Sequence, residues 1–296
     1  MRRKLLITGA SGFIGRNLHE AFSTGYRVTA PRHRELDLLD SDAVMSYLER
    51  GQFDFVIHSA THNATRNSAV DTAKVLHSNL RMFFNLVRGN QLYGRMIYFG
   101  SGAEYGRATM PSKVKEDHFG AHVPTDDYGF SKYISRLAAE QSPNIYNLAL
   151  FGCFGRYEDW EIRFISNALC KALHGLPVTM RQNVFFDYLY INDFCAIVRR
   201  FLEIERPAHR HYNVCTGHAI DLLSLGRMVL DTAGLKTGIQ IANSGLGREY
   251  SGNNARLLAE IGGFEFTPHR QAIGELADWY RERLSEIRRE LLLADK

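Results

Sequence analysis

The stretch KLLITGASGFIGRNLHEAF, residues 4–22, decides the fold of this chain. It reads as a short buried strand, a glycine turn and then a helix that begins near Phe13. Gly9 permits the tight turn, Gly12 lets the backbone approach a pyrophosphate, and Gly15 lets the helix pack closely on the strand. Amide groups at the helix N-terminus would then face the phosphates. The stretch therefore predicts a dinucleotide-binding turn, with a purely structural glycine turn as the alternative.

The alternation that begins there continues to about residue 155. Apolar strands are expected at residues 26–31, 53–61, 95–101 and 146–152, with a further short strand from residue 35. Helical patterns separate them, and one of these helices has Asp40 or Ser41 as its N-cap. Strands that alternate with helices and lack polar alternation indicate an α/β fold with a doubly wound parallel sheet.

Beyond Phe154 the pattern loosens. Helices are expected at residues 162–175, 220–234 and 270–293, and a strand at residues 185–191. We therefore expect a dinucleotide-binding domain over residues 1–155 and a smaller α/β substrate-binding lobe mainly over residues 156–296. The chain is expected to return to the first domain at about residues 181–215.

Composition excludes several classes of protein. The chain has 296 residues, of which 45% are hydrophobic and 23% are charged, as in ordinary soluble domains. Its net charge of +4 is spread along the chain, which argues against a nucleic-acid binder. No apolar stretch reaches the length of a membrane span, and the first apolar run is too short for a signal peptide. A cytoplasmic location is expected.

Cysteine and histidine patterns do not predict a metal site. The four cysteines have no close spacing, so neither a zinc knuckle nor a disulfide framework is indicated. His118 and His122 are four residues apart, but no cysteine or carboxylate accompanies them at ligand spacing. No metal is therefore expected.

The segment after the second strand bears on the choice of cofactor. An NAD site usually places an acidic residue there, on the ribose hydroxyls. Here Arg32, His33 and Arg34 come before any acidic residue. A guanidinium pairs with phosphate oxygens, so Arg32 favours NADPH, which carries a 2′-phosphate. Glu35 keeps NAD open as the second choice, and solvated surface arginines are the alternative explanation.

The stretch DDYGFSKY, residues 126–133, places Tyr128 and Lys132 four residues apart at the start of a helix, on one helical face. A phenol has a pKa near 10, and an adjacent ammonium helps it to exchange protons by favouring the phenolate. Ser101 directly follows an apolar strand, at the carboxyl edge where ligands of such sheets bind. The three residues are candidates for one catalytic site.

In this order the motifs resemble those of the extended short-chain dehydrogenases/reductases that act on nucleotide sugars. The resemblance rests on TGASGFIG, HSAT at 58–61, Asn79, GSGAEYG, YGFSK, FFDYLYINDF at 185–194 and YNVCTG at 212–217. It implies a catalytic triad of Ser101, Tyr128 and Lys132, with Lys132 also holding the nicotinamide ribose. It further implies that the second lobe binds a nucleotide diphosphate. The implied cofactor contacts, besides the three glycines and the two catalytic residues of the helix, are Ser11, Phe13, Ile14, Arg32, His58, Ser59, Ala60 and Asn79.

Within the family, ELDLLDSDAV at 35–44 is most similar to GDP-fucose synthase-like 4-ketoreductases, which use NADPH. Gly152 and Phe186 depart from the wider pattern, where an Asn and an Arg are common. Arg163, Arg181 and Arg248 are the candidates for the substrate diphosphate, with surface salt bridges as the alternative for each.

The resemblance predicts NADPH-dependent reduction of a 4-keto nucleotide sugar, with GDP slightly favoured, in surface polysaccharide biosynthesis. An NAD-dependent epimerase and a non-catalytic dinucleotide sensor are the alternatives. The helices expected at about 73–90 and 128–141 resemble those through which family members form homodimers, so a homodimer is expected.

Two side reactions are predicted to be absent. Related 4,6-dehydratases carry an Asp and a Glu just after the serine, where this chain has Gly102 and Ala103. GDP-fucose synthase inverts C3 and C5 of the sugar with a Cys and a His, which match Ala103 and Arg163. Neither alanine nor arginine exchanges protons readily near neutrality. Ala103 is therefore expected in the substrate site without a chemical role. His118 or His122, in the loop before Tyr128, is the alternative acid or base for epimerisation.

Overall fold

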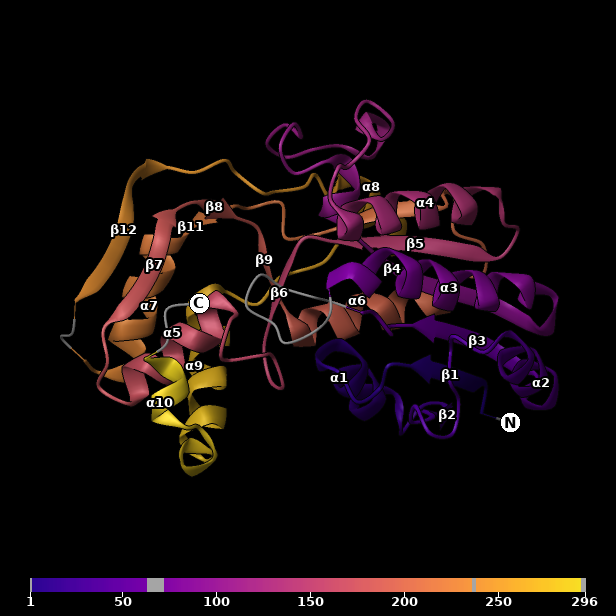
Figure 1. Cartoon of the computed structure of the whole chain (residues 1–296), viewed down its shortest axis with the longest axis horizontal. Helices are drawn as coiled ribbons and strands as arrows, with labels where there is room; N and C mark the ends of the chain where they lie inside the picture. The colour runs from indigo at the N-terminus through magenta and orange to yellow at the C-terminus, as the bar shows by residue number, and fades with distance from the viewer. Residues whose placement is uncertain (1, 63–71, 236–237, 294–296) are drawn as a thin grey trace.

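The computed structural model describes residues 2–62, 72–235 and 238–293. Figure 1 shows two lobes side by side, and the larger one contains the N-terminal half of the chain. The larger lobe is built on a six-stranded sheet whose strands are all parallel, in the order β10-β5-β4-β3-β1-β2. The strands are β1 (Lys4–Thr8), β2 (Arg27–Thr29), β3 (Phe53–His58), β4 (Tyr93–Ser101), β5 (Ile145–Leu150) and β10 (His211–Val214).

Helices cover both faces of this sheet, which confirms the doubly wound α/β fold. Successive residues of β1 point to opposite faces, so Leu5 and Ile7 join one hydrophobic cluster and Leu6 joins another. The first cluster includes residues of α1 and α6, and the second includes residues of α2, α3 and α4. These helices are α1 (Phe13–Phe22), α2 (Ser41–Gly51), α3 (Val75–Arg88), α4 (Asp127–Gln141) and α6 (Ile191–Glu203).

The short strand expected from residue 35 does not form in this described part of the chain, so that prediction is wrong. The backbone amides there are used in local turns: those of Glu35 and Leu36 donate to the carbonyl of Arg32. Leu36 and Leu38 are buried against the second cluster, which explains their apolar pattern without a strand. The N-cap of α2 is Asp40, whose carboxylate accepts from the amides of two following residues at 3.0 Å.

The smaller lobe combines helices with three two-stranded sheets. In these, β12 pairs with β7 in parallel, β11 with β8 in antiparallel fashion, and β6 with β9 in parallel. Its strands are β6 (Gly152–Phe154), β7 (Val178–Asn183), β8 (Phe185–Phe186), β9 (Tyr188–Tyr190), β11 (Ile220–Asp221) and β12 (Ile239–Leu246). Its helices are α5 (Phe164–Leu173), α7 (Leu222–Ala233), α9 (His269–Arg281) and α10 (Arg289–Leu292).

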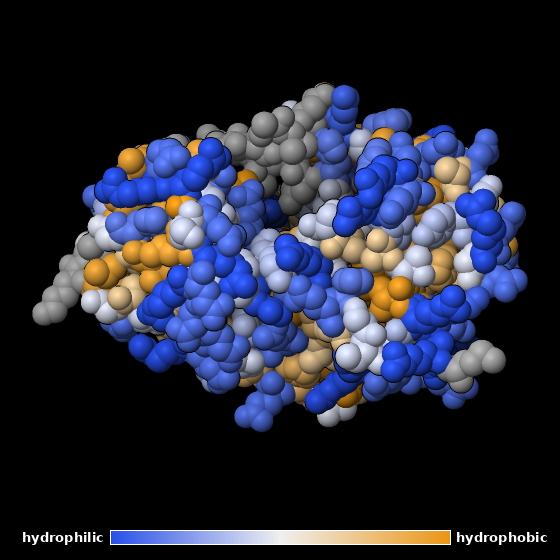
Figure 2. All heavy atoms as spheres, turned by 90° about the horizontal axis from the view of Figure 1, so that it is seen from below, coloured by the Kyte–Doolittle hydropathy of each residue, from blue (hydrophilic) through white to orange (hydrophobic). Residues whose placement is uncertain are grey.

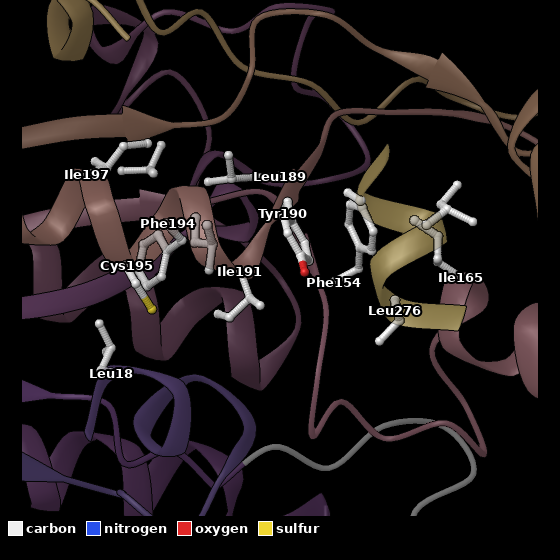
Figure 3. Packing of buried hydrophobic residues seen from close by; sticks show 14 of the residues in the cluster. Leu18, Phe154, Ile165, Leu189, Tyr190, Ile191, Phe194, Cys195, Ile197 and Leu276 are labelled. Carbon is white, nitrogen blue, oxygen red and sulfur yellow. The ribbon is translucent and has the colours of Figure 1, made fainter. Parts of the chain in front are cut away.

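The chain passes between the lobes more than once. After β9 it enters α6, which packs on α1, and β10 then extends the central sheet beside β5. A further helix, α8 (Ala255–Ile261), packs on β10. Figure 3 shows the result as continuous packing, from Leu18 and Phe194 through Tyr190 and Phe154 to Leu276 of α9. One hydrophobic cluster therefore extends through both lobes.

The C-terminal helix expected at residues 270–293 is interrupted. Helix α9 ends at Arg281, a short 3₁₀ turn follows at Leu284–Glu286, and α10 comes after it. The break lets Ile287 and Leu292 turn back into the main hydrophobic cluster, where they are 6% and 1% exposed. Among the residues that the structure describes, no helix has the length and apolar character needed to span a membrane. Hydrophilic residues cover most of the face shown in Figure 2, with small hydrophobic patches between them.

Candidate active site

A cavity of about 1160 Å³ lies at the carboxyl ends of β1, β3 and β4. Strands β2 and β3 flank β1 on opposite sides, so this is the point in the sheet where the direction of strand order changes. Ligands of doubly wound sheets bind at such a point. Its lining comes from both lobes, because residues of the glycine turn and of α4 share it with Arg163, Tyr188 and Leu222.

The glycine turn forms one end of the cavity, and its backbone geometry requires glycine. Gly9 has φ +70°, and a Cβ there would lie 2.6 Å from the backbone of Ala60. A Cβ on Gly15 would overlap the carbonyl oxygen of Gly9, so this glycine sets how closely α1 approaches β1. Gly12 is the N-cap of α1 and contributes no capping side chain. The amides of the first turn are therefore available to an anionic group.

Other expected cofactor residues lie around this end. Gly9, Gly12, His58 and Ala60 line the cavity, together with Ser11, Phe13, Ile14 and Ser59. Gly15 and Asn79 are not among the lining residues that the structure describes. The side-chain oxygen of Asn79 accepts from the amide of His62 at 2.7 Å, so it supports the segment that follows β3. These residues fit a dinucleotide, because the glycine backbone could hold the pyrophosphate and the rest of the cavity could hold the remainder of the molecule.

His58 is buried and stays neutral. Its Nδ1 lies 2.8 Å from the hydroxyl oxygen of Thr8. Burial, and then the nearby ammonium of Lys132, lower the pKa of His58 to about 3. The ring therefore adds no charge to the cofactor end of the cavity at neutral pH.

The segment after β2, in which Arg32 was expected to contact the ribose 2′-phosphate, borders the cavity. Arg32 is exposed, and its amide donates to the carboxylate of Glu35 at 2.8 Å. Arg32 is not among the described residues that line the cavity. The adjacent His33 does line the cavity, and its Nε2 lies 3.6 Å from Asp37. Sequence reasoning missed Asp37 as a lining residue, together with Leu36, Leu38 and Leu39. The buried leucines that flank an acid in residues 35–40 were the available signal.

Ser101 is the last residue of β4 and lies in the cavity wall, 4% exposed. Its Oγ accepts from the amide of Ala103 at 3.2 Å, and the carboxylate of Glu104 accepts from the amide of Ser101 at 3.5 Å. Together they form a capping box on the 3₁₀ turn that follows β4. The turn fixes both the backbone and the hydroxyl of Ser101.

Glu104 is directed away from the cavity into the interior. It is completely buried, and Arg136 of α4 donates to it at 2.9 Å. Burial raises the pKa of Glu104, while Arg136 and Asn147 oppose the shift. The pair ties the 3₁₀ turn after Ser101 to α4, which carries the other two catalytic candidates.

Tyr128 and Lys132 lie on the first turns of α4, whose N-cap Asp126 accepts from the amide of Gly129 at 2.8 Å. The ammonium of Lys132 donates to the carbonyl of Phe99 at 2.8 Å and lies 5.6 Å from the centre of the Tyr128 ring. Burial alone would lower the pKa of Lys132, but nearby Tyr98 and Tyr128 raise it above its usual value. The ammonium therefore stays charged beside Tyr128.

The catalytic candidates come together, whereas the substrate candidates do not. Ser101, Tyr128 and Lys132 line the same cavity. Arg163, the N-cap of α5, also lines this cavity. Arg181 and Arg248 are exposed, and neither is among the described residues that line the cavity. Ala103 is fully buried, and its amide donates to Oγ of Ser101.

Several charged or polar lining residues had no signal in the sequence, and Arg107, Glu158 and Tyr250 are three of them. Arg107 lies with its guanidinium 4.9 Å from the ring centre of Tyr250, and Tyr250 lies in the wall near Ser101. Glu158 is 7% exposed and accepts from the hydroxyl of Ser166 at 2.5 Å. Burial raises the pKa of Glu158 to about 8. All three come from loops or short connections, where periodicity gives no information about what lies nearby.

Among the described residues, no three His, Cys, Asp or Glu side chains come together to hold a metal ion. The rings of His118 and His122 lie 6.0 Å apart in the loop before α4. All four cysteines are free thiols.

Comparison with known proteins identifies relatives over most of the chain. A model of the NAD dependent epimerase/dehydratase family matches residues 5–215. The GDP-L-colitose synthase of Yersinia pseudotuberculosis is 34% identical over 256 residues, which cover 79% of this chain and 83% of that protein. The GDP-L-fucose synthase of Azorhizobium caulinodans is 24% identical over 254 residues, which cover 78% of this chain and 81% of that protein.

The fold is shared with a solved structure of a GDP-mannoheptose C4 reductase from Campylobacter jejuni with NADP bound. The TM-score is 0.82, the sequences are 16% identical, and the match covers 95% of this chain and 98% of that one.

Proposed function

Because this chain belongs to the NAD dependent epimerase/dehydratase family, we propose that it reduces a 4-keto nucleotide sugar with NADPH. The observation that carries the proposal is the cavity itself, which Ser101, Tyr128 and Lys132 line together with the glycine turn. Both relatives compared above are named for GDP-linked sugars, which favours a GDP-linked substrate. In this proposal the first lobe holds the dinucleotide, and the second lobe holds the nucleotide sugar.

Residues of the chain supply the proton for the keto oxygen and stabilise the negative charge that develops during the reduction. A bound NADPH supplies the hydride for the keto carbon. Tyr128 donates its phenolic proton to the keto oxygen as negative charge develops there, a step that contributes about 10²–10⁴-fold to the rate. Ser101 donates a hydrogen bond to the same oxygen. The charged Lys132 stabilises the phenolate that Tyr128 becomes.

The groups around Ser101 support a reduction without dehydration or epimerisation. Gly102 and Ala103 cannot exchange protons, and Glu104 is paired with Arg136 in the interior. Arg163 also lines the cavity, but its side chain is a guanidinium, which is a poor base. We therefore propose that C3 and C5 of the sugar keep their configuration.

The test uses the purified protein, NADPH and GDP-4-keto-6-deoxymannose in deuterated water. We expect one NADPH to be consumed for each sugar reduced, with no deuterium at C3 or C5 of the product. Deuterium at either carbon would show that epimerisation accompanies reduction, because epimerisation passes through carbanions that take up solvent deuterium. A protein that retains NAD and consumes no NADPH would instead be an epimerase.

The resemblance to the dehydrogenases/reductases that act on nucleotide sugars supports two further parts of the proposal. The reaction would serve surface polysaccharide biosynthesis in the cytoplasm. The protein would form a homodimer through α3 and α4, which pack side by side in the larger lobe (Figure 1).

A further inference from the structure

A second tyrosine besides Tyr128 lies close to Ser101: Tyr250, from the C-terminal part of the sequence. Its oxygen lies 3.4 Å from Oγ of Ser101, although the two residues are 149 positions apart. Its backbone is fixed on both sides: its amide donates to the carbonyl of Phe185 at 2.9 Å, and its carbonyl accepts from the amide of Asp187 at 3.1 Å. The side chain is 6% exposed and lines the cavity.

Packing holds the Tyr250 ring in this orientation. The rings of Phe151 and Phe186 lie 5.3 and 5.6 Å from it, centre to centre, and Arg107 lies over it at 4.9 Å. A ring enclosed by two aromatic side chains and a guanidinium has little freedom to move its phenolic oxygen away from Ser101.

Gly102 makes room for this hydroxyl. A Cβ on Gly102 would lie 2.6 Å from the Tyr250 oxygen and equally close to the Phe151 ring. Position 102 therefore has no side chain, and the space that a Cβ would fill contains the Tyr250 hydroxyl. Glycine at 102 and tyrosine at 250 fit each other.

Either oxygen could be the donor between Ser101 and Tyr250, and the hydrogen-bond capacity of Ser101 favours donation by the phenol. A serine hydroxyl accepts two hydrogen bonds and donates one. The Ala103 amide uses one acceptor position at 3.2 Å, and the Tyr250 hydroxyl lies within reach of the other. Burial raises the pKa of Tyr250, so its hydroxyl stays neutral near neutral pH and can donate. With both acceptor positions used, the Ser101 proton remains for a ligand in the cavity.

We propose that Tyr250 is a positioning residue, which donates to Ser101 and thereby directs the serine proton to the reacting oxygen of the substrate. The proposal rests on the proposed function for the identity of that oxygen. Hydrogen bonds of this kind are often long without ligand and shorten when the substrate is bound.

A double-mutant cycle of Tyr250→Phe and Ser101→Ala tests this inference. Tyr250→Phe removes only the hydroxyl, and we expect kcat to fall about tenfold, as for loss of one neutral hydrogen bond, with KM for the sugar and NADPH affinity little changed. If Tyr250 acts through Ser101, adding Tyr250→Phe to Ser101→Ala should lower kcat no further. Effects that multiply, or a Tyr250→Phe variant with wild-type kcat, would overturn the inference.

Two further variants make the test independent of folding defects. Tyr93→Phe removes another buried hydroxyl, which donates to the carbonyl of Leu86 at 3.0 Å near the start of β4, and it should leave kcat unchanged. Gly102→Ala keeps the Tyr250 hydroxyl but displaces it. It should reproduce the loss in kcat, and again add nothing to Ser101→Ala.

The cycle is run on the reaction that the wild type catalyses, either reduction of a 4-keto sugar or interconversion of nucleotide hexoses. A wild type that reduces no 4-keto sugar contradicts the proposed function, whereas multiplying effects contradict only the role of Tyr250.

Discussion

Tyr128 is the side chain whose loss should affect turnover most. Tyr128→Phe keeps the ring beside Lys132 but removes the proton that the keto oxygen needs, so we expect turnover to fall by about 10²-fold or more. NADPH binding, measured by fluorescence titration, should change little, because the glycine turn and Lys132 remain. Near-normal turnover in this variant would show that another group supplies the proton.

Glu158 should make the stability of the fold depend on pH. Burial raises its pKa to about 8 in the folded protein, so the fold favours the protonated carboxyl. The stabilisation is complete below its ordinary pKa, near 4.5, and is lost as the pH rises through about 8. By linkage the loss at pH 8 is about 4 kcal/mol.

Thermal unfolding at several pH values between 5 and 8 measures this loss. Glu158→Gln cannot ionise, so its midpoint should fall less than that of the wild type as the pH rises. Glu205→Gln, a change at an exposed site, should follow the wild-type curve. Parallel curves for all three proteins would mean that Glu158 does not titrate in this range.

Single residues were predictable where a local motif defines them. Ser101, Tyr128, Lys132 and the glycines stand in short segments that predicted a site through their place between strands and helices and through the family resemblance. Tyr250 and Glu158 line the same cavity, but nothing in their neighbourhood in the sequence marks them. Their positions depend on how the second lobe closes over the first, which no local pattern encodes.

At the scale of elements, the contact between β1 and α1 should tolerate no added methyl group. Gly15→Ala would place a Cβ against the carbonyl of Gly9, and the helix would have to move away. We expect a loss of stability of about 1–3 kcal/mol and weaker NADPH binding. Gly274→Ala in α9 is the matched control: a Cβ there meets no atom within 4 Å, so it should gain up to about 1 kcal/mol. Chemical denaturation and NADPH titration of both variants would check this, and equal effects would contradict it.

Elements were predictable where periodicity and burial agree. Strands β1, β3, β4 and β5 of the central sheet were placed correctly because both of their faces are covered, which makes them largely apolar. Strand β10, which the sequence pattern did not predict, joins the same sheet only through the fold. The predicted strand from residue 35 failed because its buried leucines belong to a turn. The prediction of one long C-terminal helix failed because Leu284, Ile287 and Leu291 continue the helical spacing of apolar residues beyond the end of α9 at Arg281.

The whole molecule is expected to be a homodimer in solution. Leu137 of α4 remains 40% exposed in the single chain, on one of the two helices proposed for the interface. Light scattering should give twice the 33.7 kDa of one chain, and Leu137→Glu should give a monomer because burying a charge is costly. Leu246→Glu, at an exposed leucine of β12 in the other lobe, should leave the dimer intact. A monomeric wild type would contradict the proposed assembly.

The place of β10 in the sheet has a consequence for biosynthesis. Strand β5 ends at Leu150, but its neighbour β10 begins only at His211, so the ribosome makes some sixty residues in between, most of them in the second lobe. During that interval one edge of β5 exposes unpaired amide and carbonyl groups, and such an edge can pair with strands of other nascent chains. Ribosome pausing after β5 has emerged but before β10 has emerged should therefore increase aggregation, whereas pausing after β10 has left the ribosome should not.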